Sequence, residues 1–145
     1  MIIMNSNNYA LYDGSVVQII SGSYPRYTIR KVGTTNVIND ANCLHISLLK
    51  KGILEACGFQ KEDDRPQYAC TLSGQNITVF VTYSMGQMNK ECKLCIYYSG
   101  DFNEEKCKYL IMLDDLQDFI RDNTSLELNV DEKALIEAVK INQYR

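Results

Sequence analysis

The chain has 145 residues, of which 46% are hydrophobic and 23% are charged, and its net charge is −3. This length is that of one ordinary domain, and the composition excludes long disordered segments. The acidic balance excludes a protein that coats nucleic acid through a basic surface. No apolar run reaches the roughly 18 residues that span a membrane, and the N-terminus lacks the pattern of a secretory signal. We therefore expect a single domain over residues 1–145 in the cytoplasm, where the six cysteines stay reduced.

The first part of the chain, residues 9–46, has the pattern of a small β module. Turn signals at Asp13-Gly14 and at Gly33 separate short runs that are rich in β-branched residues and tyrosine. The expected strands cover residues 15–20, 27–32, 37–38 and 43–46, with breaks at 21–23 and 39–42. Several short strands joined by tight turns favour a small curled antiparallel sheet or an SH3-like barrel.

The remaining sequence, residues 47–145, predicts helices that cover a second sheet. Ser47 is a suitable N-cap for a helix over 48–57, and Gly58 stands where a glycine commonly ends a helix. Phe59 would then fold back onto the helix end. Strands are expected at residues 67–72, 76–83 and 91–98. In the second of these strands, alternation places the valines on one face and the threonines on the other.

The segment that begins at Lys108 predicts the main helix of the fold. Its apolar side chains recur at steps of three and four, which places them on one side of a helix. They are Tyr109, Met112, Leu113, Leu116, Phe119 and Ile120. The opposite side, which we expect to face water, carries Asp114, Asp115 and Asp118. The alternating run 126–128 is a candidate strand, and Asp131 begins a last helix that reaches Tyr144. The predicted fold class is α+β, with the N-terminal β module beside a second antiparallel sheet that the helices cover.

Cys92 and Cys95 have the C-x-x-C spacing of a zinc ligand pair. A structural zinc site needs a second pair of ligands, and the sequence contains no second C-x-x-C. The surrounding residues have the pattern of a strand, on which side chains three positions apart point to opposite faces. We therefore expect free thiols, no metal site and no cofactor.

His45 is the only histidine in the sequence, and it stands two positions from Cys43. Both residues would share one face of a strand, so a Cys–His nucleophile pair is an open alternative to a structural histidine. The acidic residues suggest no converging carboxylate site, and the common nucleotide-binding and hydrolase motifs are absent from the sequence. We expect no catalytic residues.

A basic and aromatic stretch at residues 24–31 is the clearest candidate for a binding surface. Single-stranded nucleic acid is bound by this combination, because rings stack on bases and cations hold phosphates. The candidate residues are Tyr24, Arg26, Tyr27 and Arg30. The alternative is an ordinary exposed hairpin with its arginines in water, and the acidic charge of the whole chain favours it.

Three segments carry a family resemblance. They are residues 12–19, YDGSVVQI, residues 46–59, ISLLKKGILEACGF, and residues 108–116, KYLIMLDDL. In order and spacing they resemble a group of small uncharacterised proteins of Bacteroidetes genomes, prophages and phages. That group shows a "G-x-x-V-x-V" strand, a "P-L-T-E-E-x-L-L-x-x-G-F" helix and a "K-Y-V-H-Q-L-Q-N-L-Y" helix. Ile111, Met112 and Asp114 stand where the group has His, Gln and Gln. The resemblance implies a phage or mobile-element setting and brings no activity with it.

Together these patterns predict a binding or interaction protein without enzymatic activity. The resemblance narrows this expectation to an accessory factor of the anti-defence type in the cytoplasm of a bacterial host. Its partner would be a host protein or a second copy of the chain, and no membrane is involved. The alternative is a nucleic-acid or nucleotide ligand held by the tyrosines and arginines of residues 24–31.

Overall fold

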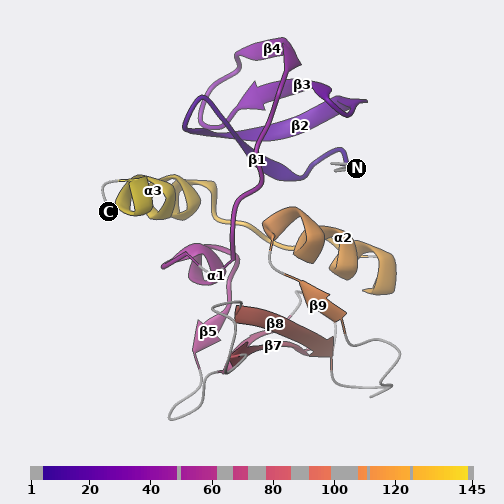
Figure 1. The fold of residues 1–145 in the computed structure, drawn as a ribbon, viewed down its shortest axis with the longest axis vertical. Helices are drawn as coiled ribbons and strands as arrows, with labels where there is room; N and C mark the ends of the chain where they lie inside the picture. Colours follow the sequence, from indigo (N-terminus) through magenta and orange to yellow (C-terminus); the bar gives the residue numbers. More distant parts are fainter. Residues whose placement is uncertain are drawn as a thin grey trace.

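The computed structural model describes residues 5–48, 50–61, 67–71, 78–85, 92–98, 108–110, 112–124 and 126–143. Within these residues the chain forms two antiparallel sheets and three helices, so the predicted α+β class is confirmed. Figure 1 shows the first sheet at one end of the molecule and the second sheet at the other, with the helices between them.

The first sheet is a meander in which each strand pairs with the next one along the chain. Its strands are β1 (Tyr9–Tyr12), β2 (Ser15–Ser23), β3 (Arg26–Lys31) and β4 (Val37–Ala41). After β4 the chain returns to β1, where Leu11 and Leu44 exchange two backbone hydrogen bonds of 2.8 and 2.9 Å. The predicted strand at 43–46 is therefore wrong. Leu44 forms only an isolated bridge to β1, which joins the segment after β4 to the first strand of the curled sheet.

The predicted breaks at 21–23 and 39–42 are also wrong, since β2 and β4 continue through most of these residues. A register shift between Ile19 and Ser21 absorbs the irregularity in β2, as a bulge does. Gly22 has a φ of 110°, and a Cβ at this position would lie 2.8 Å from the carbonyl oxygen of Arg26. Gly22 pairs with Tyr27 past this register shift, so the strand continues through a glycine that in the sequence suggests its end.

The predicted helix over 48–57 shortens to α1 (Ile53–Ala56). Gly52, with a φ of 86°, occupies the N-cap, and Ser47 instead forms an isolated bridge with Met112. The prediction for the helix end is confirmed, because Gly58 has a φ of 87° and follows the helix. Phe59 is buried, and its N–H donates to the carbonyl of Leu54 at 3.1 Å.

The second sheet is a five-stranded antiparallel meander. Its strands are β5 (Gln60–Lys61), β6 (Gln67–Thr71), β7 (Thr78–Met85), β8 (Cys92–Tyr98) and β9 (Lys108–Leu110). The predicted strands at 67–72, 76–83 and 91–98 are confirmed where the structure describes them, and positions 72, 76–77 and 91 lie outside the described residues. Tyr109, predicted in the main helix, lies in β9 opposite Cys95 of β8.

Two longer helices complete the described chain, α2 (Leu113–Thr124) and α3 (Glu132–Gln143). As predicted, the apolar side of α2 is buried, and it comprises Leu113, Leu116, Phe119 and Ile120. Asp131 caps α3, because its carboxylate accepts the N–H of Ala134 at 3.1 Å. Within the described residues 126–131 no strand forms, so the candidate strand at 126–128 is wrong. Position 144 lies outside the described residues.

The apolar side chains gather in two cores. The larger core joins side chains of the first sheet, all three helices and β7, including Tyr9, Val16, Val79 and Val81. The smaller core lies within the curled first sheet and comprises Ala10, Val17, Ile19, Tyr27, Ile29, Ala41 and Cys43. Adjacent residues of β1 and β2 belong to different cores, because successive side chains of a strand point to opposite faces. Among the described helices, none has the length and apolar character that a membrane crossing requires.

Candidate functional site

The four residues expected to hold a ligand do not form one surface. Tyr24, which is 47% exposed, lies in the turn between β2 and β3, and the exposed Arg26 is the first residue of β3. Tyr27 is buried in the smaller core, so its ring is not available to stack on a base. Arg30 donates hydrogen bonds of 2.8 Å to both Gln18 and Glu132, and thereby ties the first sheet to α3. Tyr24 and Arg26 alone keep the predicted exposure.

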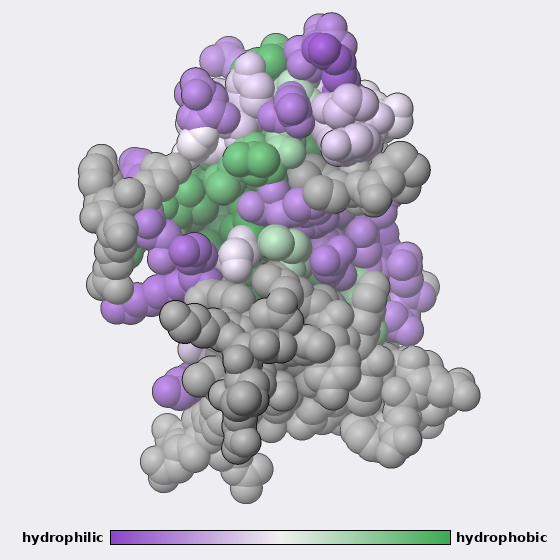
Figure 2. All heavy atoms as spheres, in the orientation of Figure 1, coloured by the Kyte–Doolittle hydropathy of each residue, from purple (hydrophilic) through white to green (hydrophobic). Residues whose placement is uncertain are grey.

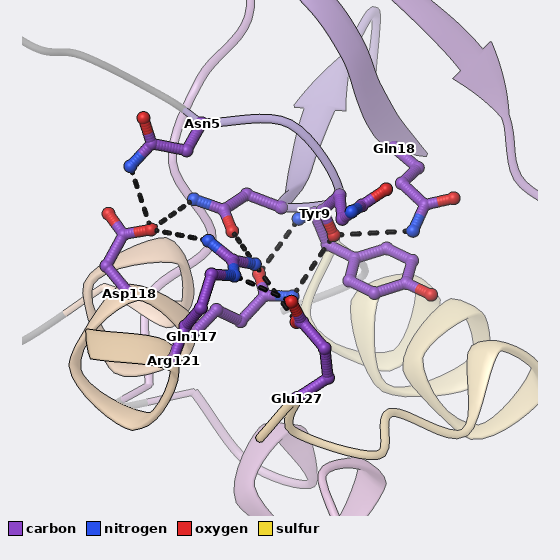
Figure 3. Close-up of polar contacts among 9 residues, drawn as sticks. Asn5, Tyr9, Gln18, Gln117, Asp118, Arg121 and Glu127 are labelled. Carbon is purple, nitrogen blue, oxygen red and sulfur yellow. Dashed lines mark hydrogen bonds and ion pairs between the residues drawn. The ribbon is translucent and has the colours of Figure 1, made fainter. Parts of the chain in front are cut away.

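The polar side of α2, which was expected to face water, instead binds the segment before β1 (Figure 3). Arg121 lies at the centre of this contact. Its guanidinium donates to Asp118 and Asn8 at 3.1 Å each, and to Glu127 at 2.7 and 3.1 Å. The side-chain amides of Asn5 and Asn8 both donate to Asp118 at 3.0 Å. We call these five residues the N-terminal network.

Two further contacts extend from β1 to the helices. The buried Gln117 accepts the backbone N–H of Tyr9 at 2.9 Å, and its amide donates to the carbonyl of Asn7 at 3.3 Å. The Tyr9 hydroxyl donates to Glu132 at 2.7 Å. Burial, together with this hydrogen bond, raises the pKa of Tyr9 above its ordinary range. These polar contacts tie β1 and the residues before it to α2 and α3.

His45 and Asp114 form a pair that the sequence did not predict. The distance between Nδ1 of His45 and Oδ1 of Asp114 is 2.7 Å. Asp114 was expected in water, but it is only 1% exposed, because α2 begins at Leu113, whose N–H donates to the carbonyl of Ile46 at 2.8 Å. This contact brings the first turn of α2 against the segment that carries His45. Burial raises the pKa of the Asp114 carboxyl, and the hydrogen bond with His45 opposes that shift.

A pocket of about 210 Å³ opens beside His45, and we call it the His45 pocket. Its apolar walls are Leu11, Ile46, Ile53 and Val139, and its polar lining consists of His45, Ser47, Lys50 and Asn142. The pocket therefore lies between β1, the turn before α1, and α3. The described residues that line it include no carboxylate, whereas one lysine and the imidazole lie beside the apolar walls.

A second pocket, of about 310 Å³, shares Val139 as a lining residue with the first. It is lined by Gly14, Ser15, Val16, Lys31, Val32, Ile136, Val139 and Lys140. Figure 2 shows hydrophobic residues gathered in the hollow between the first sheet and α3. We call the residues that line the two pockets the α3 seam. Its charged lining residues are lysines, in a chain whose net charge is −3.

The cysteines that the structure describes in full are thiols outside any disulfide, namely Cys43, Cys57 and Cys70. Burial raises the pKa of each of them, and that of Cys57 reaches about 12. A thiol is a weak nucleophile when its pKa lies this far above neutral pH. Cys92 and Cys95 lie on β8, three positions apart, as the sequence predicted. Among the side chains that the structure describes, no group of His, Cys, Asp and Glu residues could hold a metal ion.

Comparison with protein-family models, with curated proteins and with solved structures finds no match to this chain. The resemblance to the Bacteroidetes and phage group thus stays a prediction. The features that sequence reasoning missed are the His45–Asp114 pair and the pocket beside it. The one sequence signal was a lone histidine. Nothing in the local pattern relates it to a carboxylate 69 positions away.

Proposed function

We propose that this protein acts by binding a protein partner at the α3 seam and has no catalytic activity. The observation that carries the proposal is the pair of pockets that share Val139, each lined by apolar side chains together with lysine. Recognition sites combine apolar walls with a few polar groups that orient the partner, and the α3 seam has this composition. Lys31, Lys50 and Lys140 supply charge of one sign along it.

The environments of the described cysteines argue against cysteine catalysis and so favour a binding function. Cys43 was the candidate nucleophile beside His45, but it belongs to the smaller core and burial raises its pKa. His45 meanwhile has Nδ1 bound to Asp114. Because a thiolate is needed for attack, these environments suit structural cysteines better than a reactive pair.

The setting we propose is the cytoplasm of a bacterial host, where the protein would serve a phage or mobile element as an accessory factor of the anti-defence type. This part rests on the resemblance of the three sequence segments. The partner is then a host protein, and a second copy of the chain is the alternative that a mass measurement in solution distinguishes.

Retention of a host protein from bacterial lysate tests the proposal when two variants of α3 are compared. Ile136 lines the α3 seam, whereas the exposed Ile141 belongs to the same helix and does not line it. We expect the wild type and Ile141→Ser to retain the same partner, and Ile136→Ser to lose it. Equal retention by both variants, or loss from both, would contradict binding at the α3 seam.

A second candidate function is nucleic-acid binding at the β2–β3 turn, since Tyr24 and Arg26 are both exposed there. An oligonucleotide that stacks on Tyr24 and binds Arg26 would dissociate as salt is added, because phosphate contacts release counterions. The discriminating variant is Arg26→Ala, with Lys61→Ala on β5 as the control. Binding that Arg26→Ala leaves unchanged would exclude this turn as the site.

A further inference from the structure

We propose that the His45 pocket binds the C-terminal residue of a partner protein. The apolar side chain of that residue would lie between Leu11, Ile53 and Val139, and its terminal carboxylate would meet His45 and Lys50. This inference rests on the proposed function, and it names the part of the partner that is recognised.

The size of the pocket argues for a single residue. Its volume is about 210 Å³. Pockets for drug-sized ligands measure roughly 300–1,000 Å³, so this one is small for a cofactor or a nucleotide. Four apolar residues form its walls, and these exclude water from an aliphatic side chain placed among them. One apolar side chain of a partner suits such a space.

The charges of the pocket argue for an anionic group next to that side chain. Lys50 and His45 both line it, and no carboxylate is among its described lining residues. Nδ1 of His45 is bound to Asp114, so Nε2 is the ring nitrogen that remains to bind a group in the pocket. A carboxylate bound there would make charge-assisted hydrogen bonds, which are the stronger kind.

Two of the polar side chains are already fixed in place. Asp114, 1% exposed, holds the imidazole ring of His45 through the 2.7 Å contact. The Asn142 amide donates to the backbone carbonyls of Lys51 and Ala138, at 2.9 and 2.7 Å. Binding therefore does not have to order these side chains, which lowers its entropic cost.

A chain terminus fits this combination better than an internal segment does. In a C-terminal residue, the side chain and the carboxylate are both bonded to the same Cα atom, so both can enter one small pocket. An internal residue would place a neutral amide at the same point and leave Lys50 without an anion. Capture of a terminal carboxylate is an established mode of peptide recognition.

Fluorescence anisotropy of the full chain with a labelled peptide tests the inference. The probe is a flexible glycine-serine peptide that ends in leucine, prepared once with a free carboxylate and once as the C-terminal amide. We expect the free carboxylate to bind about ten-fold more tightly than the amide, since a hydrogen-bonded charge is lost in the amide. Equal affinity of the two peptides, or binding of neither, would overturn the inference.

Matched variants locate the binding. Lys50→Gln should weaken the free-carboxylate peptide about ten-fold, whereas Lys51→Gln, at an exposed neighbour that does not line the pocket, should leave it unchanged. His45→Gln should weaken binding of the same peptide to a similar extent. If His45→Gln does not fold, the result for Lys50→Gln alone tests the inference. An equal effect of Lys50→Gln and Lys51→Gln would place the peptide elsewhere and overturn the inference.

Two further outcomes separate the possible sources of the carboxylate. If free 4-methylpentanoate binds as tightly as the peptide, the pocket serves small acids, and the inference of a protein terminus is overturned. If no carboxylate peptide binds but Ile136→Ser still loses a partner from lysate, the proposed function stands and this inference alone fails.

Discussion

At the scale of single residues, the burial of Asp114 needs a physical account. Its Oδ1 is bound to His45, whereas its Oδ2 is buried without a hydrogen-bond partner in the described structure. A buried carboxylate oxygen without a hydrogen-bond partner destabilises the folded state and so lowers the free energy of unfolding. We infer that the fold tolerates this cost because Asp114 fixes the ring of the only histidine at the edge of a pocket.

The pH dependence of stability tests this account through Asp114→Asn. Burial raises the pKa of Asp114 above its ordinary value of 3.8. Between 3.8 and the raised pKa, the folded protein binds more protons than the unfolded chain does. The contribution of Asp114 to the free energy of unfolding therefore falls as pH rises through this window. We expect urea unfolding of Asp114→Asn to lack this fall.

The control for this prediction is Asp122→Asn, which removes an exposed carboxylate from the same helix. It should keep the pH dependence of the wild type over the same window, from pH 3.8 to the raised pKa of Asp114. Identical pH profiles for Asp114→Asn and the wild type would contradict a raised pKa at Asp114.

At the scale of elements, alternation along strands was informative and helix boundaries were not. Val79 and Val81 share one buried face of β7, as the alternation predicted. The segment around Tyr109 fits helical spacing equally well, and its pairing with Cys95 of β8 decides for a strand. That partner belongs to a different segment of the chain, so local spacing could not reveal it. The same holds for Leu44, which follows β4 in the sequence but forms its bridge with Leu11 of β1.

The candidate site shows the same limit. The sequence identified His45 as its only histidine, but placed Asp114 in water because Asp114 lies opposite the apolar side of the predicted helix. The approach of α2 to residues 45–47 depends on hydrogen bonds between distant segments. The exposed turn at Tyr24 was within reach of local rules, because it lies between two predicted strands.

The N-terminal network makes a prediction about how α2 and β1 are held together. Arg121→Ala removes four hydrogen bonds, to Asp118, Asn8 and Glu127. We expect it to lower the free energy of unfolding by about 1–3 kcal/mol, because the buried amide oxygen of Asn8 loses its charged donor and Asp118 loses one of its hydrogen bonds. Hydrogen exchange of the Tyr9 amide should also become faster, since that amide donates to the neighbouring Gln117.

The matched variant is Arg26→Ala, at an exposed position of the first sheet where surface substitutions change stability by about 0.5 kcal/mol or less. Equal stabilities for the two variants, measured by urea unfolding, would show that the N-terminal network contributes nothing to the fold.

At the scale of the whole molecule, the larger core and the polar contacts join the two ends of the structure. The larger core contains Val16 of the first sheet and Val81 of the second. Glu132 of α3 accepts hydrogen bonds from both Tyr9 and Arg30. Because the first sheet also has a small core of its own, these shared contacts are what would make the chain unfold as one domain.

Leu116→Ala tests whether the chain unfolds as one domain. Leu116 is fully buried in the larger core, and truncating such a leucine costs about 2–5 kcal/mol. If residues 1–145 form one domain, native-state hydrogen exchange should lose the same free energy of protection at Ile29, in the smaller core, as at Val81. Protection lost at Val81 alone would mean that the first sheet unfolds separately. The α3 seam would then lie between two units that move relative to each other, because one wall of each pocket comes from the first sheet.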